Sequence, residues 1–280
     1  MYIIVNLQCA EYEYPGHPES PQRVTETFKF LEQRNISFIG PAPAQEEDIL
    51  LAHSKSLLNK VKEGSFLDAD TPALTNIYEY AKLSAGGAIC AAELARAGKP
   101  AFSLMRPPGH HATKEKLGGF CYFNNIAIAV KKLQRKACRT AILDIDCHHG
   151  NGTEDIFFGD KNTLYVSLHQ TPLYPGTGQV SRGNCLNFPL AAGIAEPLYL
   201  NILDKAMGEI ANFSPEVIAV SCGFDTYEHD PLCGLKLKQK TYKKIAEKIS
   251  ALRVPIFSVL EGGYSPDLKY CIWEYVQGIG

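Results

Sequence analysis

The sequence predicts an α/β fold with one central, mostly parallel β-sheet and helices on both of its faces. Short, continuous apolar runs alternate with longer segments of helical character. Strands that are buried on both faces have such unbroken apolar runs, and parallel strands need crossover helices between them. Clusters of polar residues follow several of the runs, as expected where a site lies beyond the carboxyl ends of the strands. Residues 1–280 contain no repeat and no interdomain linker, so we expect a single domain.

The elements follow in order along the chain. The apolar runs predicted to be strands are 2–7, 101–105, 139–145, 164–169, 217–221 and 255–260. The segments predicted to be helical are 21–34, 46–62 (one or two helices), 73–97, 122–136, 152–158, 195–212 and 238–251. We expect Ser20 to cap the first helix, with Pro21 at its first position. Gly86 and Gly87 lie inside the long helix at a cost of about 2 kcal/mol relative to alanine, which predicts that another element packs closely there.

Composition excludes several classes of protein. Hydrophobic residues make up 45% of the chain and the net charge is −2, which favours neither nucleic acid nor an anionic membrane as a partner. Nine scattered cysteines without a CxxC pair argue against a disulfide framework and for a reducing compartment. No apolar run approaches the ~18 residues of a membrane span, and the N-terminus lacks the basic region of a signal peptide. We therefore expect a cytoplasmic protein.

The stretch 141–153, AILDIDCHHGNGT, contains the strongest chemical signal in the sequence. It combines the end of a buried strand with a glycine-rich loop. Side chains alternate in an extended chain, so Asp146 and His148 point the same way and can converge on one cation. Asp225 follows another predicted strand and can be the third ligand, which leaves a position open for water and substrate. Two carboxylates and one imidazole suit zinc, but also iron(II), cobalt or manganese.

Two further segments supply groups for catalysis. His110 and His111 follow the strand at 101–105 and are placed where a general base and its electrostatic partner would lie. Tyr264 follows a Gly-Gly turn after the last strand and can donate a hydrogen bond to a developing oxyanion. Together with a metal ion, these groups fit metal-assisted amide hydrolysis.

The sequence resembles the zinc-dependent histone deacetylases and their bacterial relatives, which include acetylpolyamine amidohydrolases. The motifs that carry this resemblance are GHPESPQR (16–23), RPPGHHA (106–112), GFCYFNN (119–125), DIDCHHGNGT (144–153), YPGTG (174–178), GFDTYEHDPL (223–232) and EGGY (261–264). They run in order through nearly the whole chain. The resemblance implies the arginase–deacetylase fold, with an eight-stranded parallel sheet.

The resemblance also implies roles for the catalytic residues. The zinc ligands would be Asp146, His148 and Asp225. His111 would act as general base on the attacking water and then as acid toward the leaving amine, with Asn151 as its partner. His110 would remain an electrostatic partner, hydrogen-bonded to Asp144. Tyr264 would polarise the acetyl carbonyl.

The remaining residues implied by the resemblance surround the substrate and a second ion. Phe120 and Tyr174, with Gly119 beside them, would form a narrow tunnel for an aliphatic chain, and Leu232 would contact the same substrate. Asp70 would hold substrate backbone amides at the rim. A structural K⁺ or Na⁺ would be bound by Asp144, Asp146, His148, Ser167 and Leu168.

The sequence departs from the family pattern at four positions. Asn151 stands where some members have aspartate, so His111 should be less basic. Cys147 and Cys222 flank the predicted ligands and are either inert packing or sites of oxidation. Leu232 stands where a polyamine-selective relative carries glutamate, which disfavours a cationic polyamine as substrate.

These features favour a metal-dependent deacylase that acts on acetyl-lysine or related acyl-lysine in proteins or peptides. The first alternative is an amidohydrolase of acetylpolyamines or other small amides. A weakly active binding protein of the same fold is a second alternative, against which the complete set of ligands and Tyr264 argue. A dinuclear ureohydrolase of the arginase type would need further bridging Asp and His residues, which the motifs lack.

Overall fold

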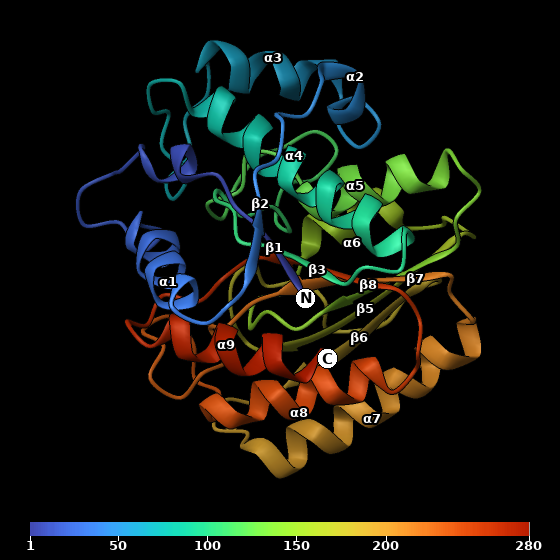
Figure 1. The fold of residues 1–280 in the computed structure, drawn as a ribbon. Coiled ribbons are helices and arrows are strands. Elements are labelled where there is room, and N and C mark those ends of the chain that lie inside the picture. The colour runs from blue at the N-terminus through green and yellow to red at the C-terminus, as the bar shows by residue number, and fades with distance from the viewer. Residues whose placement is uncertain (280) are drawn as a thin grey trace.

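The computed structural model describes residues 1–279, which fold around one eight-stranded sheet. The strand order is β2-β1-β3-β8-β7-β4-β5-β6, and every neighbouring pair is parallel. Helices cover both faces of this sheet (Figure 1). The predicted fold class and the strand number implied by the resemblance are therefore confirmed.

The elements have the following bounds. The strands are β1 Tyr2–Ile4, β2 Ser37–Ile39, β3 Ala101–Ser103, β4 Thr140–Asp144, β5 Thr163–Gln170, β6 Cys185–Leu190, β7 Val217–Cys222 and β8 Ile256–Leu260. The α-helices are α1 Gln22–Glu32, α2 Glu46–Ile49, α3 Lys55–Glu63, α4 Ile77–Arg96, α5 Asn125–Gln134, α6 Asn151–Phe157, α7 Glu196–Phe213, α8 Gln239–Ser250 and α9 Leu268–Gly278, and η1 Leu7–Ala10 is a 3-10 helix. All six predicted strands are present, whereas β2, β6 and α9 have no counterpart among the predictions.

The two unpredicted strands form the edges of the sheet. No residue of β2 is fully buried, and β6 alternates buried with more exposed positions and contains Pro189. Edge strands are buried incompletely and tolerate proline, so they lack the continuous apolar run that identifies the central strands.

Both faces of the sheet pack against apolar side chains of helices. Successive side chains of β4 point to opposite faces of the sheet. Ala141 and Leu143 join the core shared with α1, α7, α8 and α9, and Ile142 joins the core shared with α3, α4 and α5. In Figure 1 these two helical layers lie on opposite sides of the strands. No described helix is long and apolar enough to span a bilayer.

Close packing at the glycine pair of α4 is confirmed. A Cβ atom at Gly86 would lie 1.9 Å from the backbone oxygen of Ala42, and one at Gly87 would lie 2.6 Å from the Met105 side chain. The pair therefore lets the helix approach both a loop and the chain that follows β3.

The beginning of α1 differs from the prediction. Pro21 occupies the N-cap position and no side chain caps the helix, so the expected Ser20 cap is wrong. Arg23 N–H instead bonds to the backbone oxygen of Ser20. A serine cap of the kind expected for α1 occurs at α3, where the Ser54 side chain accepts a hydrogen bond from Leu57 N–H.

The register of the central strands brings the polar segments to one edge. Asp144 at the end of β4 pairs with Ser221 near the end of β7, and Ser221 pairs with Val259 near the end of β8. The segments that follow these strands consequently leave the sheet side by side, which places the candidate site at their carboxyl ends.

Candidate active site

Three side chains that follow two strand ends converge where a metal ion can bind. Asp146 and His148 follow β4, and Asp225 follows β7. His148 Nδ1 lies 3.2 Å from Asp146 Oδ1 and 2.8 Å from Asp225 Oδ2. The three potential ligand atoms lie within 4.8 Å of one another, and both carboxylates are fully buried. The structure therefore brings the three predicted ligands together.

The charges of this cluster fit a cation. Burial and the neighbouring Asp146 raise the pKa of Asp225 to about 7, because two buried carboxylates repel each other. Burial would lower the pKa of His148, but its hydrogen bonds to Asp146 and Asp225 raise it to about 10. The proton on His148 thus offsets part of the negative charge. A divalent cation held by the same atoms would replace that proton and offset both carboxylates, so the donor set fits zinc.

Two glycines let the backbone approach the ligand carboxylates. A Cβ at Gly223 would lie 2.2 Å from Asp146 Oδ2, and one at Gly262 would lie 2.6 Å from oxygens of both Asp146 and Asp225. The N–H of Gly262 donates to Asp146 Oδ2 at 2.7 Å, and the N–H of Cys147 donates to Asp225 Oδ1 at 2.8 Å. Each carboxylate is therefore oriented by a backbone donor.

The two adjacent histidines have different partners and different charge. His110 Nδ1 lies 3.0 Å from Asp144 Oδ2, and His111 Nδ1 lies 2.8 Å from Asn151 Oδ1. Burial would lower the pKa of His110, but Asp146 and Asp144 raise it to about 10. Burial and the positive His110 hold the pKa of His111 well below its usual range. The pair consists of one protonated ring and one neutral ring, and the neutral ring can accept a proton.

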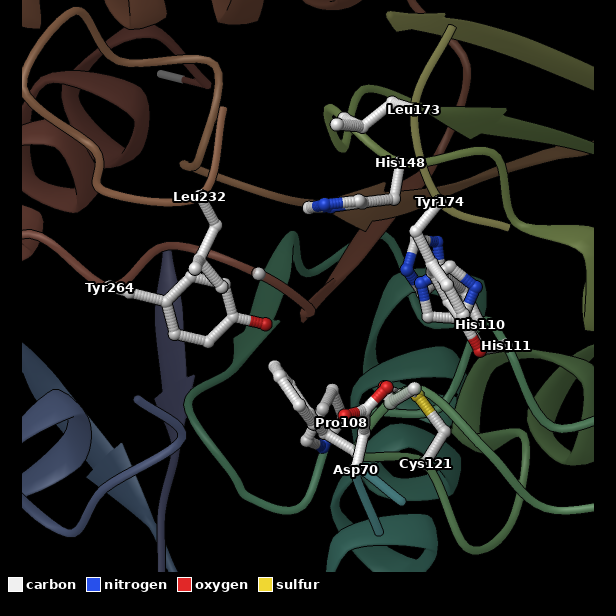
Figure 2. Close-up of a pocket in the computed structure, with 13 residues that line it drawn as sticks. Asp70, Pro108, His110, His111, Cys121, His148, Leu173, Tyr174, Leu232 and Tyr264 are labelled. Carbon is white, nitrogen blue, oxygen red and sulfur yellow. Dashed lines mark hydrogen bonds between the residues drawn. The ribbon is translucent and has the colours of Figure 1, made fainter. Parts of the chain in front are cut away.

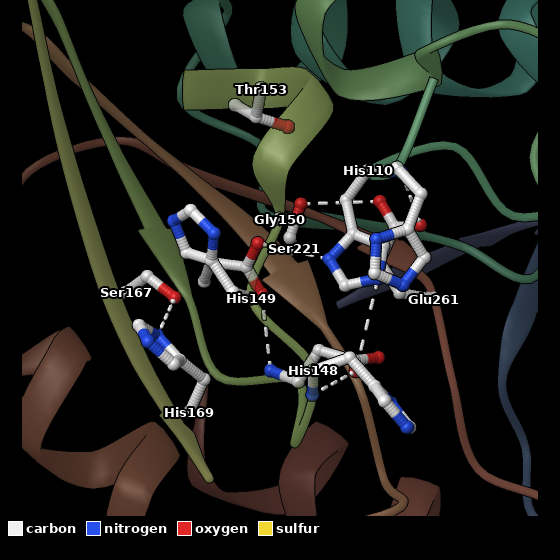
Figure 3. Close-up of polar contacts among 12 residues, drawn as sticks. His110, His148, His149, Gly150, Thr153, Ser167, His169, Ser221 and Glu261 are labelled. Atoms are coloured by element: carbon white, nitrogen blue, oxygen red, sulfur yellow. Dashed lines mark hydrogen bonds and ion pairs between the residues drawn. The ribbon is translucent and has the colours of Figure 1, made fainter. Parts of the chain in front are cut away.

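A buried carboxylate that the sequence does not single out holds the backbone of this pair. Glu261 Oε2 accepts the N–H groups of Gly109 at 2.7 Å and His110 at 3.1 Å, and Oε1 accepts the Ser221 hydroxyl at 3.1 Å (Figure 3). Burial raises the pKa of Glu261 to about 7. The glutamate belongs to the EGGY motif, but only the fold shows that its side chain reaches the histidine segment.

A cavity of about 240 Å³ reaches His148, one of the three predicted ligands (Figure 2). Its lining residues are Asp70, Pro108, His110, His111, Gly119, Phe120, Cys121, His148, Leu173, Tyr174, Leu232, Gly262 and Tyr264. Figure 2 shows the hydroxyl of Tyr264 directed into the cavity. Burial raises the pKa of Tyr264 well above its usual range, so this hydroxyl keeps its proton and can donate it to a hydrogen bond.

Aromatic and aliphatic side chains form the walls of this cavity. The ring of Phe120 stands edge-on to that of Tyr264 with centroids 5.7 Å apart, and the ring of Tyr174 stands edge-on to His111 at 5.0 Å. Leu232 is half-buried and lines the same space. These predicted tunnel positions therefore surround one apolar passage.

Carboxylates and glycines lie at the mouth of the passage. Asp70 is exposed and lines the cavity, and its N–H donates to Asp68 Oδ1 at 3.0 Å. Within residues 1–279 neither carboxylate forms an ion pair. Gly119 has a φ of 56°, and a Cβ there would lie 2.5 Å from the ring of His111. The mouth is thus acidic, and its glycine allows the loop to pack directly on His111.

The residues predicted to bind a monovalent cation lie beside the metal centre. Asp144 and Ser167 are opposite each other in neighbouring strands, and both are fully buried. Ser167 Oγ lies 2.8 Å from His169 Nδ1, and Tyr165 donates to Asp144 Oδ2 at 3.0 Å. Binding of K⁺ or Na⁺ by these side chains and by the carbonyls of Asp146, His148 and Leu168 stays a prediction.

Histidines outside the central motifs have structural contacts. Buried His53 bonds through Nδ1 to the backbone oxygen of Thr113 at 2.9 Å and accepts from Asn124 N–H at 2.8 Å. His17 packs edge-on against Phe120 at 4.5 Å, so it supports a tunnel wall.

The cysteines differ from expectation at one pair. Cys147 and Cys233 form a disulfide across a sequence separation of 86, while Cys222 is buried and free. The scattered spacing predicts no such pair, because partners this far apart meet only through the fold. Cysteine usage therefore does not identify the compartment of this protein.

The chain is similar to known proteins over most of its length. Residues 17–279 match the family model described as the histone deacetylase domain. A probable deacetylase from Archaeoglobus fulgidus is 37% identical over 290 aligned residues, which cover 94% of this chain and 81% of that protein. Acetylpolyamine amidohydrolase 1 of Pseudomonas aeruginosa is 39% identical over 272 aligned residues, which cover 92% of this chain and 74% of that protein.

Solved structures are similar over the whole fold. The crystal structure of an acetylpolyamine aminohydrolase from Burkholderia pseudomallei matches with a TM-score of 0.92 at 26% sequence identity. The match covers 100% of this chain and 98% of that chain.

Proposed function

Because this chain belongs to the histone deacetylase domain family, we propose that it removes the acetyl group from acetylated polyamines. Membership of the family makes the chain an amidohydrolase, and the choice of substrate is the proposed part. The observation that supports the proposal is the cavity, in which the predicted ligand His148, neutral His111 and the Tyr264 hydroxyl line one apolar passage with Asp70 at its mouth.

The side chains of the cavity have complementary tasks in this proposal. Zinc, on which the family depends, would be held by Asp146, His148 and Asp225 and would supply Lewis-acid chemistry toward the acetyl carbonyl and the attacking water. His111 takes a proton from the water and returns it to the leaving amine, because its imidazole is neutral. Tyr264 donates its hydrogen bond to the carbonyl oxygen as negative charge develops there.

Two features support a polyamine as the substrate. Several relatives 38–39% identical to this chain are named acetylpolyamine amidohydrolases. In addition, Asp70 lines the mouth of the cavity, and the neighbouring Asp68 carboxylate accepts its N–H, so both carboxylates would attract the distal ammonium of a polyamine. The apolar walls at Phe120 and Tyr174 would enclose the aliphatic chain. Together these features favour the polyamine over the acyl-lysine substrate that the sequence favours.

Acyl-lysine in proteins or peptides is the second candidate substrate. Leu232 supports it, because this apolar side chain lines the passage where a polyamine-selective relative carries glutamate. Asp70 supports it as well, since an exposed carboxylate at the rim can accept backbone N–H groups of a peptide.

A comparison of substrates tests the proposal. The purified protein is assayed for bound metal and for kcat/KM on N-acetylputrescine, N8-acetylspermidine and an acetyl-lysine peptide. We expect the acetylspermidine value to exceed the peptide value by about tenfold or more, since the ammonium gains a charged partner. Equal values, or a preference for the peptide, would show that the proposed substrate is wrong.

Variants of the mouth separate the two candidates further. Asp68→Asn should lower kcat/KM for acetylspermidine by about three- to tenfold and leave the peptide unchanged, because only the polyamine presents an ammonium there. Leu232→Glu should raise the preference for the polyamine. Lys136→Gln, on the loop after α5, serves as a matched surface-charge control and should change neither substrate.

A further inference from the structure

A disulfide connects the metal-ligand loop to the loop that lines the tunnel. Cys147 lies between the predicted ligands Asp146 and His148 and is fully buried. Cys233 directly follows Leu232 and is half-buried. Their sulfurs are bonded and their Cα atoms lie 6.4 Å apart, within the range for disulfides. Within the described residues the other seven cysteines are free.

On the metal side, Cys147 is part of the support of the ligands. Its N–H donates to Asp225 Oδ1 at 2.8 Å, and its carbonyl accepts from Gln170 N–H at 2.8 Å. A change in the position of Cys147 therefore changes the orientation of a predicted ligand carboxylate and of the loop between Asp146 and His148.

On the tunnel side, Cys233 belongs to a loop that supports the oxyanion donor. Asp230 accepts the N–H of Leu232 at 3.0 Å and the N–H of Tyr264 at 2.7 Å. Gln170 Oε1 accepts the N–H of Gly234 at 2.8 Å, so the same loop is fixed on its other side. The loop 230–234 thus joins a tunnel wall, the Tyr264 turn and the disulfide.

From these contacts we propose that Cys147 and Cys233 are a thiol–disulfide exchange site, whose redox state sets the position of the tunnel loop relative to the metal ligands. The reductant is a dithiol, either a small molecule or a dithiol protein. One of its thiolates attacks the Sγ of half-buried Cys233, the S–S bond breaks, and Cys147 leaves as a thiolate and takes up a proton. The second thiol of the reductant then displaces Cys233, so the dithiol is oxidised to a disulfide and both cysteines are reduced.

The bond affects function because it is the only covalent link between the two loops in the described chain. In the oxidised form Leu232 and Asp230 stay fixed relative to Cys147. In the reduced form only non-covalent contacts remain, such as those of Gln170 and Asp230, so the loop samples more conformations. Substrate binding and metal binding should both weaken on reduction.

The experiment compares oxidised and dithiothreitol-reduced protein, with the reductant removed and zinc restored before assay. Mass spectrometry under non-reducing conditions maps the disulfide, and the readouts are KM for acetylspermidine and the Kd for zinc. We expect reduction to raise KM by about three- to tenfold, with a smaller change in kcat. Hydrogen exchange of 230–234 should become faster.

Variants distinguish the effect of the Cys147–Cys233 bond from side effects of dithiothreitol. Cys233→Ser should show the reduced KM and zinc Kd under both conditions, which also controls for removal of metal by dithiothreitol. Cys90→Ser removes a free cysteine of α4 and should respond to reduction as the parent protein does. The proposal is overturned if oxidised parent protein contains both thiols free, or if oxidised and reduced forms have equal KM, zinc Kd and exchange rates.

The KM readout rests on the proposed function, whereas the zinc Kd, the disulfide map and hydrogen exchange do not. Absence of hydrolysis of acetylspermidine together with a redox-dependent zinc Kd would reject the proposed substrate and retain the exchange site. Hydrolysis with no redox dependence in any readout would reject the exchange site and retain the function.

Discussion

Removal of one oxygen atom, that of the Tyr264 hydroxyl, has the largest effect on kcat that we predict. Its hydroxyl points into the cavity, and burial keeps it protonated. Tyr264→Phe retains the ring that packs against Phe120 but removes the donor to the developing oxyanion. We expect kcat to fall by about 10²- to 10³-fold with little change in KM, as for loss of other oxyanion donors.

Steady-state kinetics with measured zinc content checks this expectation. Tyr270→Phe is a suitable control, because this tyrosine is exposed and packs on Phe30 away from the cavity. A kcat within about twofold of the parent for Tyr264→Phe would show that the hydroxyl is not the oxyanion donor.

Substitutions of Glu261 provide a second test. They examine whether this residue positions the backbone of the histidine segment rather than taking part in the reaction itself. In Glu261→Ala the N–H groups of Gly109 and His110 lose their acceptor, at about 1–3 kcal/mol for each buried donor left unpaired. In Glu261→Gln the amide oxygen can still accept both, and its NH₂ can donate to Ser221. We therefore expect Glu261→Ala to lower kcat by more than about tenfold, while Glu261→Gln stays within about threefold.

The pH dependence of kcat/KM distinguishes this role from a loss of folding. The charge of Glu261 contributes to the raised pKa of His110. Glu261→Gln removes this charge and should therefore shift the pH profile of kcat/KM, whereas loss of a purely structural contact would not shift it. The pKa of His110 falls when a nearby negative charge is lost, so the limb reporting His110 moves to lower pH. Equal kcat for the Ala and Gln variants at equal zinc content would contradict the positioning role.

At the scale of elements, the glycines of two helices should respond in opposite ways to alanine. A Cβ at Gly86 in α4 would collide with the backbone oxygen of Ala42, whereas Gly208 in α7 has no atom within 4 Å of such a Cβ. Helix propensity alone favours alanine by about 1 kcal/mol at both positions. We expect Gly208→Ala to stabilise by up to that amount and Gly86→Ala to destabilise by about 2–4 kcal/mol, because rigid backbone must move.

Urea unfolding of both variants measures this difference. If Gly86→Ala were as stable as Gly208→Ala, α4 would not depend on the close approach that the structure shows.

The central strands could be predicted because each is a continuous apolar run buried from both faces, as in β4 and β7. The edge strands β2 and β6 could not, because they are less completely buried and their side chains do not form a continuous apolar run. The ends of elements depend on capping contacts that an apolar pattern does not encode, as the start of α1 after Pro21 illustrates.

At the scale of the whole molecule, one buried ion pair joins the N-terminal loop to the segment that precedes the histidines. Arg106 is fully buried, and its Nη2 lies 2.7 Å from Glu19 Oε2. Tyr12 and Arg23 also bond to the Glu19 carboxylate. Burial would raise the pKa of Glu19, but Arg106 holds it below its ordinary value of 4.5.

A lowered carboxylate pKa stabilises the fold above the unfolded pKa, and this stabilisation is lost as pH falls through the folded pKa. Glu19→Gln should therefore lower the free energy of unfolding by about 3 kcal/mol at neutral pH, since Arg106 is left without its counter-charge. The difference from the parent should shrink as pH falls below 4.5. Denaturant unfolding at several pH values measures it.

Glu26→Gln is the matched control, because Glu26 pairs with Lys29 on the surface. Its effect should stay below about 1 kcal/mol at every pH. A pH-independent loss for Glu19→Gln would contradict the assigned charge of Glu19.

The sequence by itself determined the fold class, the family and the residue types of the candidate site. The fold class could be predicted because central parallel strands need continuous apolar runs. The site residues could be predicted because the polar motifs directly follow those strands and place ligands such as Asp146 and His148 close together in sequence. Only the tertiary structure decided which distant groups meet. The contact of Glu261 with His110 and the bond between Cys147 and Cys233 join segments 151 and 86 residues apart. No local pattern encodes such contacts, because they depend on the strand order and register that bring those segments to one edge of the sheet.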